Sequence, residues 1–121
     1  MAYFEGEEAG LKVKEILKEA SGKEKELFIS VINWGEVLYV IEGRYGIERR
    51  DEIERLMGQM HLEIVPADSD QARTAAHLKA AHRLPYADCF AAALAIKKKA
   101  SLVTGDKDFK PIEAELKIDW L

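Results

Sequence analysis

The feature that most constrains this sequence is an apolar, alanine-rich segment that leads through a short strand into an acidic loop. Residues 84–96 form that segment, and Pro85 near its start suits the first position of a helix. Residues 101–104 then have strand character, and Gly105 permits a tight turn out of the strand. The pattern predicts a helix and then a strand whose carboxyl end carries the acidic loop, where open α/β sheets place their functional sites.

The rest of the chain alternates short apolar runs with segments of helical periodicity. The run at the first predicted strand is expected to pass into a helix near its end, and Asp68 or Ser69 to cap the helix after the second strand. Such alternation is typical of an α/β domain with a largely parallel sheet and right-handed crossovers. Helices are predicted at about residues 7–20, 37–41, 49–60 and 70–82, and strands at residues 27–32, 62–66, 101–104 and 117–121.

Length and composition limit the classes of protein to which the chain can belong. A length of 121 residues predicts a single domain over residues 1–121, and 48% hydrophobic with 33% charged residues is ordinary for a globular protein. The sequence has no apolar run long enough to span a membrane and no apolar signal sequence after Met1, so we expect a cytoplasmic protein without membrane contact. A net charge of -4 argues against the broad basic surface of a non-specific nucleic-acid binder.

Four carboxylates follow or lie beside the carboxyl ends of predicted strands, and a parallel sheet would bring them to one rim. Hard oxygen ligands of this kind suit Mg²⁺ or Mn²⁺ rather than zinc. Two such ions about 4 Å apart would stabilise the attacking and leaving oxygens of a phosphodiester displacement. The pattern therefore favours metal-dependent hydrolysis of a phosphodiester. The four residues are Glu36, Asp88, Asp106 and Asp108.

Each carboxylate also has a purely structural interpretation. Asn33 followed three residues later by Glu36 resembles a capping box, which would make Glu36 a helix-start residue. A carboxylate at Asp88 is favoured by the dipole of the helix that it begins, and an aspartate after Gly105 is a common turn residue. Taken singly these positions do not indicate a site, and only their expected convergence does.

Other polar residues give weaker signals. Thr104, directly before the acidic loop, either orients a water or metal ligand through its hydroxyl or only ends the strand. Lysines 97–99 most simply solvate a helix end, and the alternative is that they or Arg83 contact substrate phosphates. The three histidines lack the spacing of a metal site.

Residues 86–95 and 102–109 resemble the PIN domain family, in particular the VapC-type toxin ribonucleases. Residues 29–37 are similar to the family's segment that carries an acidic residue at the start of its second helix. The resemblance covers nearly the whole chain. It implies a PIN-like three-layer α/β/α fold with a small, mainly parallel sheet.

The same resemblance implies an activity and partners. Glu36, Asp88 and Asp106 would be metal-binding catalytic carboxylates, and Asp108 and Thr104 would assist them. The activity would be that of a Mg²⁺- or Mn²⁺-dependent endoribonuclease, with RNA as substrate and a VapB-like antitoxin that blocks the acidic pocket. The amount of apolar surface on the predicted helices additionally suggests a homodimer.

The chain departs from the family pattern at its start. PIN domains open with an apolar strand that ends in an aspartate, and residues 1–7 look like the segment just after that strand. We expect a start assigned too late or a truncation, or else a partner chain that supplies the strand. Its loss would leave a gap between the strands at Leu27 and Ser101, unless those two strands are parallel neighbours here.

The departure also leaves a second function open. A PIN remnant without the first carboxylate would be catalytically impaired, and would act as an interaction module that binds an antitoxin or RNA without cutting it.

Overall fold

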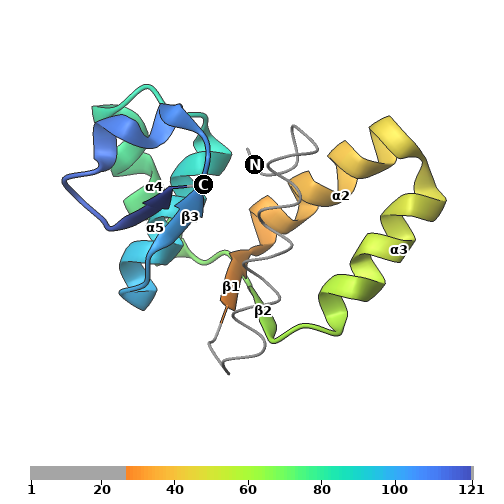
Figure 1. The fold of residues 1–121 in the computed structure, drawn as a ribbon. Coiled ribbons are helices and arrows are strands. Elements are labelled where there is room, and N and C mark those ends of the chain that lie inside the picture. The colour runs from red at the N-terminus through yellow and green to blue at the C-terminus, as the bar shows by residue number, and fades with distance from the viewer. Residues whose placement is uncertain (1–26, 121) are drawn as a thin grey trace.

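A computed structural model describes residues 27–120, which form helices and short parallel strands arranged in two halves (Figure 1). This alternation confirms the predicted α/β class. The helix expected at about residues 7–20 lies outside the described residues. The described elements are β1 (Leu27–Ser30), α2 (Val31–Tyr45), α3 (Ile47–Gly58), β2 (Leu62–Val65), α4 (Ser69–Ala81), α5 (Tyr86–Lys98), β3 (Leu102–Thr104), the 3-10 helix η2 (Lys107–Ile112) and β4 (Ile118–Trp120).

The strands pair in two separate parallel ladders. β1 pairs with β2, with Leu27 opposite Leu62, and β3 pairs with β4, with Leu102 opposite Ile118. No ladder within residues 27–120 joins β1 to β3, so the alternative in which these strands are neighbours is wrong. The single small sheet that we predicted is therefore divided in the described part of the chain, because no described strand lies between β1 and β3 to connect them.

The first half, residues 27–65, contains β1, α2, α3 and β2. The expected strand at 27–32 ends earlier than predicted because the Ser30 hydroxyl accepts a hydrogen bond from Ile32 N and caps α2. Gly46 then joins α2 to α3 with a φ of 93°, a conformation that favours glycine. A small core holds the half together, made of Ile29, Val37 and Ile41 with Trp34, Ile53, Met57 and Leu62 packed against it.

The second half, residues 66–120, is built on α4 and α5, which pack closely. Asp68 caps α4 by accepting a hydrogen bond from Gln71 N at 2.8 Å, as one of the two predicted caps. Pro85 precedes α5 instead of opening it, so the predicted start is one residue early. Small side chains let the two helices approach within a core made of Ala75, Leu78, Leu84, Cys89, Phe90, Ala92, Ala93, Phe109 and Ile112.

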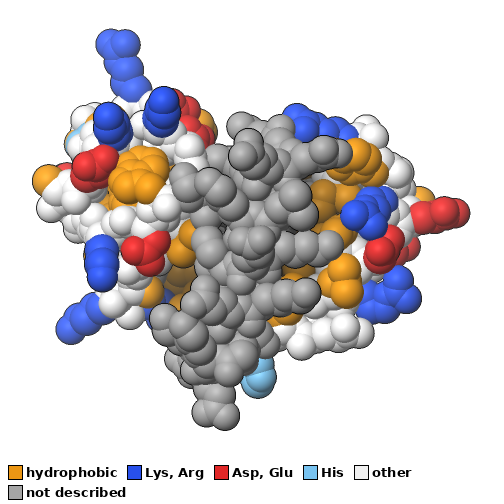
Figure 2. All heavy atoms as spheres, viewed as in Figure 1, with side chains coloured by type: hydrophobic (Ala, Val, Ile, Leu, Met, Phe, Trp, Pro, Cys, Tyr) orange, Lys and Arg blue, Asp and Glu red, His pale blue; other side chains and the backbone are white. Residues whose placement is uncertain are grey.

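The surface of the described residues carries both signs of charge. Figure 2 shows Lys, Arg, Asp and Glu side chains interspersed over both halves on the face in view, rather than gathered into one basic area. None of the helices in residues 27–120 is long and apolar enough to cross a membrane.

The core between α4 and α5 predicts the effect of shortening the side chain of Leu78, which is 2% exposed. We expect Leu78→Ala to lower the free energy of unfolding by about 2–5 kcal/mol, because the change removes buried methyl groups and leaves a cavity. The matched control Leu56→Ala, at a side chain that is 37% exposed, should cost less than about 1 kcal/mol. Urea denaturation followed by circular dichroism measures both, and equal losses would contradict this packing.

Candidate active site

Asp88 is the only buried one of the four predicted site carboxylates. We call these four residues, Glu36, Asp88, Asp106 and Asp108, the acidic region. Asp88 lies in the first turn of α5 and is 8% exposed. Burial raises the pKa of Asp88 to about 6, and the negative charges of Asp106, Glu36 and Asp108 act in the same direction. The charges of all three other predicted carboxylates thus contribute to the raised pKa of Asp88, and each contribution is larger the closer the charge lies.

Asn33 connects Glu36 to the start of α5. Its Nδ2 donates hydrogen bonds to Glu36 Oε1 at 3.2 Å and to the carbonyl oxygen of Ala87, the residue before Asp88, at 3.0 Å. Asn33 is 1% exposed, and its Oδ1 has no partner among the described residues. The amide therefore sets where the α2 carboxylate lies relative to the first turn of α5.

This role of Asn33 replaces the capping box that its spacing to Glu36 suggested. Ser30 caps α2, so Asn33 is the third residue of the helix and Glu36 lies beyond its first turn. Residues three apart are neighbours on a helix surface, which is why the two side chains meet. The spacing of three residues therefore does indicate a contact between Asn33 and Glu36, but this contact lies on one face of α2 and does not cap the helix.

The loop after β3 is organised by its own side chains. Thr104, which is buried, accepts a hydrogen bond at Oγ1 from Asp106 N at 3.0 Å. Asp106 in turn caps η2, because its Oδ1 accepts a hydrogen bond from Asp108 N at 2.9 Å. The Thr104 hydroxyl therefore holds the loop backbone at Asp106, and one of the two Asp106 carboxylate oxygens, Oδ1, is already hydrogen-bonded within the loop.

The four carboxylates do not close around a common point. Within residues 27–120, no three Asp, Glu, His or Cys side chains lie close enough together to hold one metal ion. The donor chemistry fits a hard divalent cation, since carboxylates and an amide oxygen are its preferred ligands. The four residues thus offer the kind of oxygen that such an ion prefers, and the described residues do not form a complete cage.

Comparison with known proteins gives the family. The model of the PIN domain family matches residues 1–115 of the 121. The chain belongs to the PIN domain family. PIN domains are generally nucleases and generally use divalent metal ions. No curated protein matches this PIN domain in sequence.

Two solved structures have the same fold as this PIN domain. The crystal structure of VapBC2 from Rickettsia felis, bound to a DNA fragment from their promoter, is 21% identical with a TM-score of 0.70, over 88% of this chain and 82% of that chain. A toxin–antitoxin complex from Klebsiella pneumoniae is 21% identical with a TM-score of 0.57, over 77% of this chain and 74% of that chain. The predicted VapC-like PIN fold is therefore confirmed.

The raised pKa of Asp88 predicts how the stability of this PIN domain depends on pH. An aspartate titrates near 3.9 when unfolded and Asp88 near 6 when folded, so the native state binds more protons between these values. Ionisation of Asp88 therefore lowers the free energy of unfolding as pH rises through this window, and the full loss is reached above about pH 6. In EDTA, Asp88→Asn should gain stability over wild type progressively between about pH 4 and pH 7.

Thermal unfolding at a series of pH values tests this expectation. Asp70→Asn is the matched control, because Asp70 is exposed and pairs with Arg73 on the surface of α4. Its melting temperature should follow that of wild type at every pH. A stability difference between Asp88→Asn and wild type that does not vary with pH would contradict the raised pKa.

The hydrogen bonds of Asn33 predict a second stability effect. Asn33→Ala should lower the free energy of unfolding by about 1–3 kcal/mol, because it removes a buried amide that bonds two helices. Asn33→Asp should cost more at neutral pH than at pH 4, since a charged oxygen would face Glu36 and a carbonyl. Gln59→Ala, at an exposed amide, is the control, and urea titrations with equal losses for Asn33→Ala and Gln59→Ala would contradict the bridging role.

Proposed function

We propose that this PIN domain is a metal-dependent endoribonuclease, the toxin of a toxin–antitoxin pair, which hydrolyses RNA phosphodiester bonds. The observation that supports the proposal is the buried Asp88, whose pKa is raised by burial and further by the charges of Asp106, Glu36 and Asp108. Strongly perturbed carboxylates are typical of sites that bind cations or perform acid–base chemistry. Membership of a family of nucleases supports the same conclusion.

Three of the carboxylates would hold the metal. We assign Glu36, Asp88 and Asp106 to a Mg²⁺ or Mn²⁺ ion, which when bound lowers the pKa of a coordinated water and stabilises charge on the phosphate. Asn33 keeps Glu36 against α5 through its hydrogen bond to Ala87. A cation here would offset the burial and repulsion that disfavour ionised Asp88.

Thr104 and Asp108 assist by holding the loop. The Thr104 hydroxyl fixes the backbone of Asp106, and the backbone of Asp108 occupies one oxygen of the Asp106 carboxylate. The other Asp106 oxygen is then the one to face an ion or a substrate. Asp108, which is exposed, would contribute charge at the edge of the site.

The partners follow from the fold relatives. Because both solved structures named above are toxin–antitoxin assemblies, we assign a VapB-like antitoxin to this chain as well. We also propose a homodimer in the cytoplasm. RNA, as the substrate, would enter at the acidic region, where an antitoxin would block it.

A second function is favoured by one observation. Because the described carboxylates do not surround a common point, the chain in this form would bind a catalytic metal poorly. A catalytically impaired PIN domain that binds its antitoxin or RNA without cutting would have these properties. The two functions differ in one measurable respect, which is cleavage dependent on metal and on Asp88.

The test is cleavage of a structured RNA with Mn²⁺. We expect wild type to cleave and EDTA to abolish cleavage, and Asp88→Asn to be slower by about 100-fold or more, because a lost metal ligand removes several kcal/mol of transition-state stabilisation. Asp70→Asn, which changes an equally conservative but exposed aspartate, should cleave like wild type. Mg²⁺ in place of Mn²⁺ shows which ion supports the reaction.

Two outcomes would overturn the nuclease assignment. Equal rates for wild type and Asp88→Asn would remove Asp88 from the mechanism and point to a contaminating ribonuclease. No cleavage with either ion, together with binding of RNA or of an antitoxin peptide, would establish the non-catalytic function instead.

A further inference from the structure

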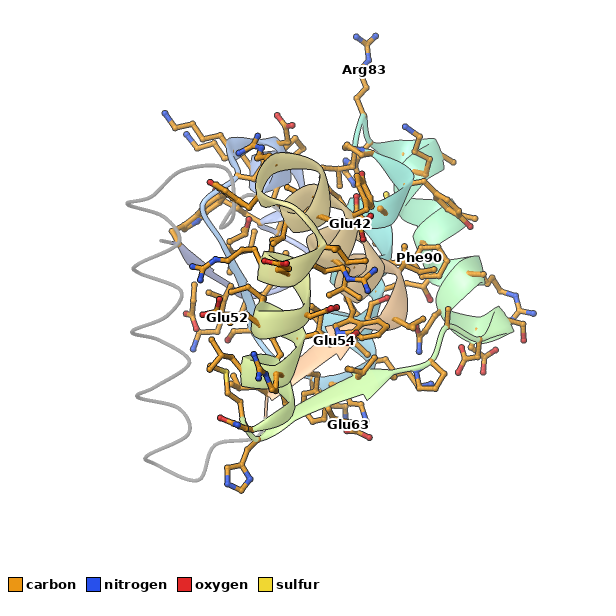
Figure 3. All side chains as sticks on the ribbon, turned by 90° about the vertical axis from the view of Figure 1, so that its right-hand side faces the viewer. Glu42, Glu52, Glu54, Glu63, Arg83 and Phe90 are labelled. Atoms are coloured by element: carbon orange, nitrogen blue, oxygen red, sulfur yellow. The ribbon has the colours of Figure 1, made fainter. Side chains whose placement is uncertain are left out.

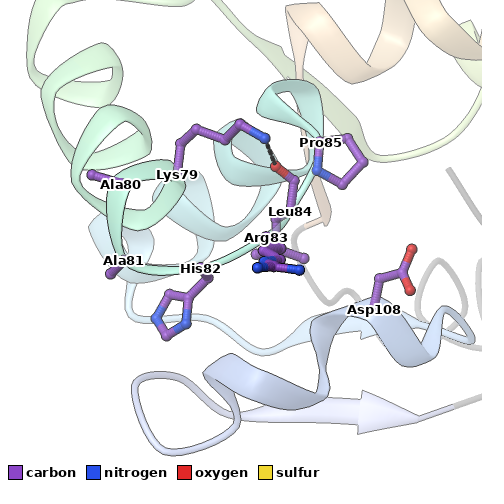
Figure 4. A pocket seen from close by; sticks show the side chains of 8 residues that line it. All are labelled: Lys79, Ala80, Ala81, His82, Arg83, Leu84, Pro85 and Asp108. Atoms are coloured by element: carbon purple, nitrogen blue, oxygen red, sulfur yellow. Dashed lines mark hydrogen bonds between the residues drawn. The ribbon is translucent and has the colours of Figure 1, made fainter.

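An open hollow of about 630 Å³ lies beside the acidic region. Its wall is formed by the end of α4, by the link that leads into α5, and by Asp108 from η2 (Figure 4). In that view Arg83 and His82 lie on one side and Asp108 on the other. The lining residues are Lys79, Ala80, Ala81, His82, Arg83, Leu84, Pro85 and Asp108.

Three basic side chains line this hollow, and they differ in how far they are engaged. The Lys79 ammonium donates a hydrogen bond to the Leu84 carbonyl oxygen at 2.7 Å, which holds it against the link. His82 Nε2 lies 3.3 Å from Glu115 Oε1, and its side chain is only 18% exposed. Both groups are thus oriented by the protein itself.

Of these three basic side chains, Arg83 is the one with no ion pair or side-chain hydrogen bond to residues 27–120. Arg83 takes part in none of the salt bridges formed among residues 27–120. Four of these salt bridges use the arginines Arg49, Arg50 or Arg73. Figure 3 shows the Arg83 side chain extending away from the ribbon. A guanidinium in this state can bind an anion through two parallel hydrogen bonds without first losing a partner within residues 27–120.

Asp108 connects the hollow to the acidic region. It lines the hollow, and it lies two residues after Asp106 in the same loop. Its backbone N–H is bonded to Asp106, so the two aspartates keep a fixed relation. A strand that places one phosphate at Glu36, Asp88 and Asp106 would therefore carry a neighbouring phosphate toward Arg83.

We propose that the hollow is a subsite for a backbone phosphate of single-stranded RNA, bound by Arg83 with help from Lys79. The proposal rests on the proposed function, because it places this phosphate next to the one that would be cleaved. A chain of net charge -4 with a cluster of carboxylates repels RNA, so a local cation is needed to hold the strand in place. Contacts to phosphate position a strand without selecting its sequence.

The experiment measures binding separately from cleavage. A fluorescein-labelled single-stranded RNA is titrated with the Asp88→Asn protein in Mg²⁺, and anisotropy is recorded at a series of salt concentrations. Adding Arg83→Gln should weaken binding by roughly three- to tenfold, and lower the slope of log Kd against log salt by about 0.7, as expected for one phosphate contact on a single strand. Arg83→Lys should keep the slope, since the charge remains, with intermediate affinity.

Arg73→Gln is the matched control, since Arg73 is an exposed arginine on α4 outside the hollow. It should leave affinity and slope unchanged. The same loss in both glutamine variants, an unchanged slope in Arg83→Gln, or no RNA binding at low salt would each overturn the subsite.

The outcomes also separate the subsite from the nuclease. Metal-dependent cleavage that requires Asp88, with unchanged RNA binding in Arg83→Gln, leaves the nuclease and removes the subsite. RNA binding that depends on Arg83, with no cleavage by wild type in either ion, leaves the subsite and removes the nuclease.

Discussion

The hydrogen bond from Asn33 to the carbonyl oxygen of Ala87 is the contact on which the acidic region depends. It joins α2 in the first half of the described chain to the first turn of α5 in the second, and the same amide holds Glu36. Since Asn33 is almost completely buried, no water competes for its donors, and the bond is correspondingly costly to break. One side chain that carries no charge therefore links Glu36 to the helix turn that carries Asp88.

The pKa of Asp88 bears on whether this residue only stabilises the start of α5 or also binds a cation. A carboxylate that only stabilises a helix start gains from being ionised, so its pKa is lowered by the dipole and by backbone N–H groups. The pKa of Asp88 is instead raised to about 6, by burial first and then by Asp106, Glu36 and Asp108. Ionised Asp88 therefore opposes folding at neutral pH. Burial beside other carboxylates accounts for the raised pKa, and the cation-binding role that we propose would give the unfavourable charge a use.

The sequence was informative where a pattern is local. Apolar periodicity and β-branched runs indicate most of the described helices and strands, and Asp68 is one of two predicted caps because capping needs only a few neighbouring residues. The role of Asn33 was missed, because its partner Ala87 lies on another helix and no spacing in the sequence indicates that contact. The hollow beside Asp108 could be predicted only in part, since it is the fold that brings Arg83 and Asp108 to its two sides. The division into two strand pairs likewise depends on which strand edges form hydrogen bonds with each other, and the sequence of a single strand does not indicate its partner.

The division of the described chain into two halves separates the carboxylates, which do not enclose a common point among the described residues. Glu36 belongs to the half whose core is Ile29, Val37 and Ile41, whereas Asp88 and Asp106 belong to the half built on α4 and α5. The two ladders share no backbone hydrogen bonds in the described residues, and the most extensive contacts between elements of the two halves are those of α5 with α2 and β1. A small change in that packing moves Glu36 relative to both aspartates at once, while Asp88 and Asp106 keep their own positions. Assembly of an ion site here is therefore a matter of how the halves pack, and the buried amide of Asn33 lies at that contact.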